Sequence, residues 1–251
     1  MVFFSDLDNT LIYSYKHDIG NDKESVEIYN GRKVSFMTRN SIEMLKEINR
    51  KIIFVPITTR TKEQYARINM DIGEFTYALV CNGGVLLING KEDEKWYEES
   101  LEITKGSREE LKKAQEILAS DEKVNFEVRN IKNLFVFTKS EHSKDVIKKL
   151  EESLDLSVVD IMLNGVKIYV LPKNLNKVNG AERFKKKINA HRAIASGDSI
   201  FDISMLNAAD IGIAPKSLGD NKFLKKNVVC IDNEKIFSEE MLKYILHNVL
   251  I

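Results

Sequence analysis

The chain has 251 residues, of which 43% are hydrophobic and 30% charged, so it can form one large domain or two modest ones around a real core. Lys plus Arg and Asp plus Glu number 38 each, and a formal net charge of zero gives no indication of nucleic acid or a membrane surface as a partner. No apolar stretch is long enough to span a bilayer and no signal-peptide pattern is present, so we expect a cytoplasmic protein. Cys81 and Cys230 lie in apolar runs, which predicts neither a disulfide nor a metal cluster.

Near the start of the chain, an apolar run ends in two carboxylates. Residues 3–12 have the sequence FFSDLDNTLI, in which Asp6 and Asp8 follow a predicted buried strand. At the carboxyl end of a parallel strand, these acids would lie where open α/β folds bind their ligands. Two acids on the same side of a strand end repel each other unless a cation lies between them, and Mg²⁺ prefers such oxygen ligands. The alternative is that the two acids only cap a following helix.

Residues 13–84 alternate between strands and helices after a small hairpin. Asn30-Gly31 joins two β-prone runs and predicts this hairpin, either beside the site or on an unrelated surface. The expected elements that follow are a helix over 38–50, a strand over 52–57 ending in Thr58-Thr59-Arg60, a helix over 62–70 and a strand over 77–81. Asn82-Gly83-Gly84 then predicts a sharp turn.

The pattern changes between about residues 85 and 170. Pairs of strands now alternate with single helices, and Asn164-Gly165 predicts another hairpin turn. The expected strands are VLLING, EKWYEES, VNFEVRN, LFVFTKS, LSVVDIML and VKIYVLP, and the expected helices span about 107–118 and 144–154. Paired strands covered by helices predict a separate α+β lid.

From Pro172 onward the strand-helix alternation returns. The expected elements are helices over 178–188, 202–209 and 238–249 and strands over 193–196, 211–214 and 228–231. We therefore predict an α/β fold, with a Rossmann-like doubly wound parallel sheet formed by residues 1–84 and 171–251 and an inserted α+β cap formed by residues 85–170.

Three further motifs follow the Asp6 and Asp8 motif in an order that makes one site. They contain Thr58 in IIFVPITTRT, Lys177 in LNKVNGAERF, and Asp198 with Asp202 in IASGDSIFDISML. With these four motifs the chain resembles the haloacid dehalogenase superfamily of phosphatases. The large insertion resembles that of the branch that includes sucrose-phosphate phosphatase and phosphomannomutase, in which a cap lies between the second and third motifs.

The resemblance implies a phosphoric monoester hydrolase with a role for each matched residue. Asp6 would be the nucleophile and form an aspartyl-phosphate, and Asp8 would act as acid and then as base. Thr58 would hold a phosphate oxygen, and Lys177 would neutralise both Asp6 and the phosphate.

The resemblance also implies a Mg²⁺ site. Asp6, Asp198 and the Asp8 backbone carbonyl would bind the ion, and Asp202 would support the site or anchor Lys177. The alternative for Asp198 and Asp202 is that they only cap and stabilise a helix. Phe201 departs from the pattern, because many relatives have Asn there, and Asn9 replaces a common Gly.

The expected function is hydrolysis of a small phosphorylated metabolite, with a sugar phosphate as the substrate class that the resemblance favours. Candidate substrate contacts are Thr59, Arg60, Asn82 and Arg129, the last in the cap. A phosphomutase or phosphotransferase using the same aspartate, and a non-catalytic binding protein of the same fold, are the alternatives. The sequence predicts no oligomeric state.

Overall fold

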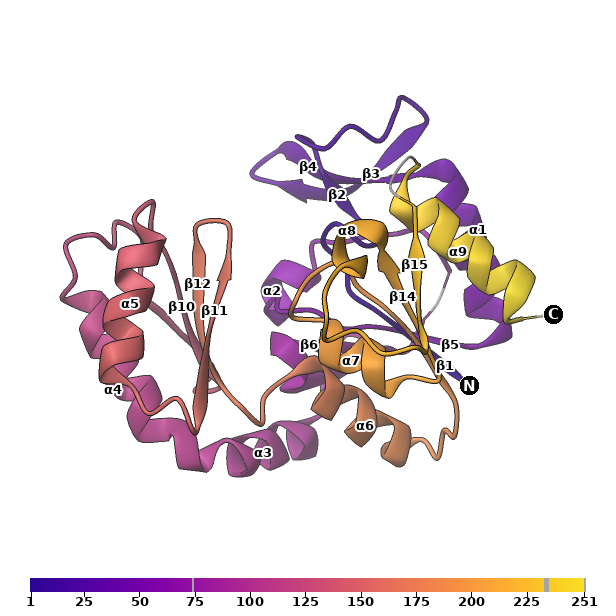
Figure 1. Cartoon of the computed structure of the whole chain (residues 1–251). Helices are drawn as coiled ribbons and strands as arrows, with labels where there is room; N and C mark the ends of the chain where they lie inside the picture. The colour runs from indigo at the N-terminus through magenta and orange to yellow at the C-terminus, as the bar shows by residue number, and fades with distance from the viewer. Residues whose placement is uncertain (74, 233–234, 251) are drawn as a thin grey trace. The chain divides into compact units, whose positions relative to one another are not determined.

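The computed structural model describes residues 1–73, 75–232 and 235–250, and it divides the chain into two compact units (Figure 1). The first unit consists of Met1–Glu92 and Lys177–Ile251, and the second of Asp93–Asn176. Both divisions fall a few residues after the expected cap boundaries. At the first of them, strands β7 (Val85–Ile88) and β8 (Lys91–Glu92) form one sheet with residues 77–80 of the first unit.

The first unit is built on a five-stranded parallel sheet with the strand order β15-β14-β13-β1-β5. Its strands are β1 (Val2–Ser5), β5 (Ile53–Pro56), β13 (Ala193–Ser196), β14 (Ile211–Pro215) and β15 (Val228–Ile231). Ser5 lies opposite Ser196 on one side and Pro56 on the other. The residues that follow these three strands therefore emerge together at one edge of the sheet.

Helices cover both faces of this sheet, as the pattern of strands and helices predicts. Phe3 packs into a core with Leu45 of α1 (Arg39–Lys51) and Met241 of α9 (Phe237–Asn248). The next residue, Phe4, points to the other face and meets Phe184 of α6 edge to face at a centroid distance of 6.0 Å. Helices α6 (Lys177–Lys187) and α7 (Ile203–Ala208) pack together. The predicted doubly wound α/β class is confirmed.

A small antiparallel sheet, here called the flap sheet, follows the first motif. It consists of β2 (Tyr13–Ser14), β3 (Lys23–Tyr29) and β4 (Arg32–Thr38) in the order β2-β4-β3. Asn30 and Gly31 both have positive φ and form the predicted hairpin turn. The register between β3 and β4 shifts on both sides of Glu27, so consecutive residues Val26 and Glu27 are both buried.

Two short elements, a helix and a strand, follow β5 in the part of the first unit that ends at Glu92. Helix α2 (Lys62–Tyr65) begins at a Thr61 capping box and is shorter than the expected 62–70. Strand β6 (Tyr77–Val80) is the first strand of a three-stranded sheet with the order β6-β7-β8. A bridge between Ile57 and Leu79 joins β6 to the end of β5. The remaining short elements of this unit are the 3₁₀ turn η1 (Cys81–Gly83) and helix α8 (Lys216–Gly219).

The second unit is an antiparallel sheet with the order β11-β12-β10-β9 and two helices packed on it. Its elements are β9 (Arg129–Ile131), β10 (Phe135–Lys139), β11 (Val159–Asn164), β12 (Lys167–Pro172), α3 (Glu94–Ile103), η2 (Lys105–Ser107), α4 (Arg108–Ala119) and α5 (Ser143–Ser153). Leu111, Leu150 and Val170 belong to one core between the helices and the sheet.

The strand expected for EKWYEES is wrong, because these residues form the first two turns of α3. The Asp93 side chain accepts a hydrogen bond from the backbone N–H of Trp96 at 3.0 Å, which satisfies an amide at the helix start. Glu94 in the first turn also interacts favourably with the helix dipole.

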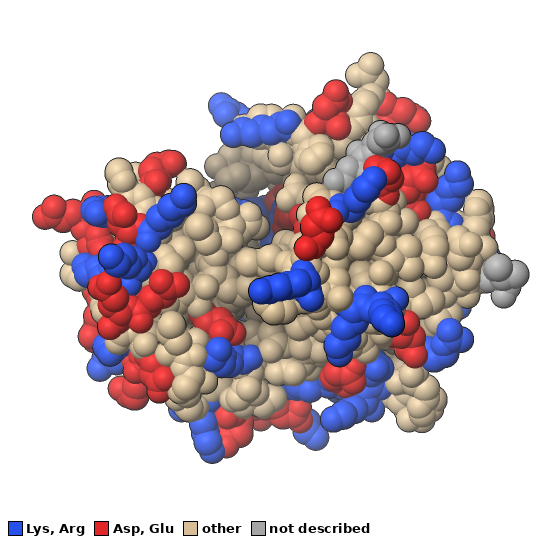
Figure 2. Space-filling view, in the orientation of Figure 1, with Lys and Arg blue, Asp and Glu red and all other residues tan. Residues whose placement is uncertain are grey.

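Acidic and basic side chains are interspersed over the face drawn in Figure 2, in keeping with the balanced composition. Among the residues that the structure describes, no helix combines the length and the apolar character needed to cross a membrane.

Candidate active site

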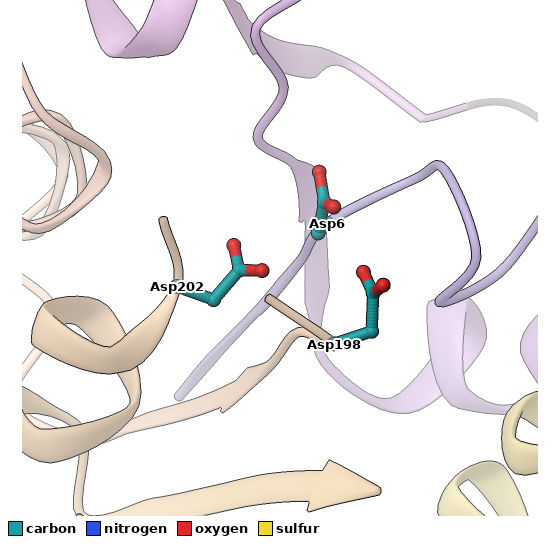
Figure 3. Close-up of side chains that lie close together, drawn as sticks. All are labelled: Asp6, Asp198 and Asp202. Carbon is teal, nitrogen blue, oxygen red and sulfur yellow. The ribbon is translucent and has the colours of Figure 1, made fainter. Parts of the chain in front are cut away.

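Three acidic side chains from two neighbouring strands meet at the carboxyl edge of the core sheet. Asp6 directly follows β1, and Asp198 and Asp202 follow β13, which pairs with β1 in parallel. Each contributes a carboxylate oxygen, and these oxygens lie within 4.8 Å of one another. Figure 3 shows the three side chains lying near one another. The sequence motifs that contain these acids are therefore brought together as expected.

Lys177 lies within this acid cluster as the first residue of α6. Its Nζ atom is 2.7 Å from Asp6 Oδ1 and 2.6 Å from Asp202 Oδ1, and only 2% of its side chain is exposed. Burial lowers the pKa of Lys177, but its ion pairs with Asp202 and Asp6 outweigh this effect and hold the pKa above its ordinary range. This direction favours the charged form of Lys177 between the two acids.

The remaining charge of the cluster is negative. Burial raises the pKa of Asp6 well above its ordinary value, although Lys177 opposes this shift. Burial and the nearby Asp202 raise the pKa of Asp198 to about 6, and Thr10 Oγ1 donates a hydrogen bond to Asp198 Oδ1 at 3.0 Å. Three carboxylates and one ammonium leave two negative charges when all are ionised. Oxygen donors with this charge fit a hard divalent cation such as Mg²⁺.

The loop around Asp202 fixes that residue in place. Asp202 is fully buried, and its Oδ2 accepts hydrogen bonds from Ser199 N and Oγ at 3.0 and 2.8 Å. A Cβ at position 197 would lie 2.3 Å from Asp202 Cβ, so Gly197 is required for this close approach. Phe201 is buried rather than turned to solvent. Ser199 therefore supplies polar contacts to Asp202 next to the unusual Phe201.

The Thr58 hydroxyl lies at the same edge, one strand away from Asp6. Thr58 is 1% exposed, follows β5 beside β1, and accepts a hydrogen bond from Arg60 N at 3.1 Å. Its carbonyl accepts from Asn82 N at 2.8 Å, which places buried Asn82 next to it with a φ of 58°. Thr59 is half-buried in the same loop.

The Asp8 carboxylate forms an ion pair with Arg60. Arg60 Nε and Nη2 donate to the two Asp8 carboxylate oxygens at 2.8 and 2.7 Å, and Nη1 is 3.0 Å from Glu27 Oε2. Sequence reasoning identified Arg60 only as a substrate candidate and assigned no role to Glu27. Asn9, in the turn directly after Asp8, has a φ of 59°, a conformation that Asn tolerates better than most residues.

Arg129 lies in β9 of the second unit. Its Nε is 2.7 Å from Glu127 Oε2, and its guanidinium lies 5.2 Å from the centroid of the Phe126 ring. Its contribution to substrate binding stays a prediction.

A family model described as haloacid dehalogenase-like hydrolase matches residues 86–235. No curated protein sequence matches the chain. A solved sucrose-phosphatase from Synechocystis, in complex with sucrose and phosphate, has a TM-score of 0.68 at 16% identity, covering 98% of this chain and 97% of that one. A solved sugar phosphatase of HAD subclass IIB has a TM-score of 0.64 at 15% identity, and the match covers 100% of this chain and 99% of that one. A haloacid dehalogenase-like hydrolase from B. subtilis has a TM-score of 0.61 at 16% identity, covering 99% of both chains. These likenesses show a shared fold.

Proposed function

The chain belongs to the haloacid dehalogenase-like hydrolases, and from this membership we propose that it is a Mg²⁺-dependent phosphatase of small phosphorylated metabolites. The proposed reaction passes through an aspartyl-phosphate on Asp6. The proposed substrate class is a sugar phosphate, because the solved structures of similar fold include a sucrose-phosphatase and a sugar phosphatase.

The observation that best supports this proposal is the buried ion pair of Lys177 with Asp6 and Asp202 beside Asp198. Burying a lysine among three acids has a large desolvation cost, so a site that contains it needs a reason beyond stability. A phosphate dianion would add more negative charge next to Asp6. Lys177 offsets part of that repulsion at the position where the phosphoryl group would be transferred.

Each residue has a distinct part in the proposed reaction. An Asp6 carboxylate oxygen attacks phosphorus, the bond to the leaving oxygen breaks, and Asp8 gives that oxygen a proton. Asp8 then removes a proton from a water molecule that attacks the aspartyl-phosphate, which releases inorganic phosphate and restores Asp6. The Thr58 hydroxyl, which already accepts from Arg60 N, has its own hydrogen free to donate to a phosphate oxygen.

The metal would be held by the side chains of Asp6, Asp198 and Asp202, with the Asp8 backbone carbonyl as a further ligand. When bound, Mg²⁺ neutralises negative charge on the phosphate and on these acids. Thr59 and Asn82 are proposed substrate contacts in the first unit, and Arg129 is a proposed contact in the second unit, which we propose as the cap. We also propose that the protein acts in the cytoplasm, with a small phosphorylated molecule as its partner.

The test is phosphate release from p-nitrophenyl phosphate and from a panel of sugar phosphates, with and without Mg²⁺. We expect release that requires Mg²⁺ and that falls about 10³-fold or more in Asp6→Asn, which keeps the side-chain size and removes the nucleophile. Isomerised sugar phosphate without free phosphate would instead indicate a phosphomutase. If Mg²⁺ binds but none of these substrates reacts, the proposed phosphatase activity is wrong.

A further inference from the structure

The Asp8 carboxylate is fixed by Arg60 rather than by the acid cluster. Arg60 Nε and Nη2 donate to Oδ2 and Oδ1 of Asp8 at 2.8 and 2.7 Å, a two-pronged contact. Such a fork fixes the plane of a carboxylate as well as its position. The Asp8 side chain is still 48% exposed. At this exposure a water molecule can reach the Asp8 carboxylate while Arg60 holds it.

Arg60 is itself held at its third nitrogen and through its backbone. Nη1 lies 3.0 Å from Glu27 Oε2, the Arg60 N–H donates to Thr58 Oγ1, and the Arg60 carbonyl accepts from Cys81 N. Its side chain is only 14% exposed. All three guanidinium nitrogens contact protein acids, which argues against Arg60 as a free ligand for the substrate phosphate.

Glu27 holds Arg60 from the flap sheet. Its side chain is 3% exposed, accepts from Ser35 Oγ at 2.6 Å, and forms ion pairs with Arg60 and Arg67 at 3.0 Å each. Asp8, Glu27 and the two arginines form a group of zero net charge. Within this group Glu27 and Arg60 are the least exposed members, so removing the Glu27 charge leaves Arg60 without one of its counter-charges at a largely buried position.

We propose that Arg60 is a positioning residue that orients Asp8 toward the water that hydrolyses phosphorylated Asp6, and that Glu27 holds Arg60 for this task. This inference rests on the proposed phosphatase function. In the water step of that reaction Asp8 must face the attacking water, and the two-pronged contact with Arg60 fixes the direction of its carboxylate. The first step with a good leaving group needs little proton donation, so it depends less on Asp8.

The experiment separates the two steps with p-nitrophenyl phosphate and Mg²⁺. Rapid mixing with excess enzyme measures p-nitrophenol release, acid quenching measures phosphorylated enzyme, and steady-state assays give kcat and KM. In Glu27→Gln and in Arg60→Lys we expect p-nitrophenol release within about threefold of wild type, kcat lowered about 10- to 100-fold, and accumulated phosphoenzyme. Arg60→Lys keeps the charge but loses the two-pronged contact, so it also covers the case in which Glu27→Gln fails to fold.

Arg39→Lys is the matched control, because Arg39 is 63% exposed, pairs with Asp22 and Glu24 rather than with Asp8 or Glu27, and keeps its charge in this variant. We expect both of its rates to stay within about threefold of wild type. Equal slowing of both steps in Glu27→Gln and Arg60→Lys, or a raised KM, would show a general structural or phosphate-binding role and overturn the inference. A wild type that releases neither p-nitrophenol nor phosphate would overturn the proposed phosphatase function, and the inference with it.

Discussion

Asp198 is the residue whose charge state should respond most clearly to pH. Burial, with a further contribution from Asp202, raises its pKa from 3.8 to about 6. An acid whose pKa is raised by folding stabilises the folded state while it is protonated. That stability is lost as the pH rises from the pKa of the acid in the unfolded state to its pKa in the folded state.

We therefore predict that the metal-free protein loses stability relative to Asp198→Asn between about pH 4 and pH 6. The pKa shift corresponds to a relative loss on the order of 3 kcal/mol in the free energy of unfolding, which is nearly complete about one pH unit above the folded-state pKa of about 6. Urea unfolding of both proteins at several pH values measures this difference. A difference between the two proteins that stays constant from pH 4 to pH 7 would show that Asp198 titrates normally.

The same protonation should compete with the proposed Mg²⁺ site. Below about pH 6, each lower pH unit should weaken apparent Mg²⁺ affinity up to about tenfold, and binding should release a proton. Calorimetric titration in two buffers of different ionisation enthalpy measures the proton. Asp198→Asn supplies the control, since it has no proton to release at this position.

For individual residues, the sequence indicated the acids of the candidate site and Arg60 as a substrate contact, but it did not indicate Glu27. Asp6, Asp198 and Thr58 each follow an apolar run, so their meeting at one sheet edge follows from the parallel fold. Glu27 could not be found this way. Strict alternation in β3 would turn the Glu27 side chain to the solvent face, away from the face of Val26. The irregular register buries both residues instead.

Among the helices and strands, the candidate site depends most on the position of α6. The helix begins at Lys177, and Gly180 lies one turn later against Gly83 of η1. A Cβ at position 180 would lie 2.9 Å from Gly83 Cα and 3.4 Å from Ile57 Cδ1. The close approach of two backbones thus brings the start of α6, and with it Lys177, to the acid cluster.

We predict that Gly180→Ala destabilises the protein by about 1–3 kcal/mol, although alanine favours a helix by about 1 kcal/mol over glycine. The shift of α6 should also lower phosphatase activity, because it moves Nζ of Lys177 away from Asp6. Urea unfolding and steady-state kinetics measure the two effects.

Gly106→Ala is the control for this prediction. A Cβ at position 106 meets no atom within 4 Å and Gly106 has no positive φ, so this variant should be neutral or stabilised by up to about 1 kcal/mol. If Gly180→Ala is as stable as Gly106→Ala and keeps full activity, then α6 can shift without cost and the prediction is wrong.

The wrong prediction for α3 shows where an element cannot be inferred from its residues alone. Trp96 and Tyr97 favour strands, and the surrounding pattern of paired strands supported that assignment. The Asp93 cap and Glu94 are helix-start signals that were present in the sequence. A propensity scale cannot weigh such a cap against aromatic side chains, because burial of Trp96 within the folded unit decides the outcome.

At the scale of the whole molecule, the sequence predicted a core interrupted by an insertion, because the strand-helix alternation stops and then returns. The exact division depends on which strands pair. β7 pairs with β6, and this antiparallel partner keeps residues 85–92 in the first unit. Pairing between strands is a tertiary property, so the local pattern of β7 could not show to which unit it belongs.

Each unit has its own buried core, with Phe3 and Met241 in the first and Val136 and Leu150 in the second. All three acids of the proposed Mg²⁺ site lie in the first unit. A ligand stabilises only the structure whose unfolding releases it. If the units open independently, Mg²⁺ should therefore protect the first unit alone.

We predict this selectivity in hydrogen exchange followed by mass spectrometry. At a Mg²⁺ concentration of 100 times Kd, the most protected amides of β1 and β13 should gain about 2.7 kcal/mol of protection, and those of β10 and β12 should gain none. Asp198→Asn at the same Mg²⁺ concentration should lose most of the gain in β1 and β13. An equal gain in all four strands would show that the two units unfold together, because protection can spread to β10 and β12 only if their opening requires the first unit to open and release the ion.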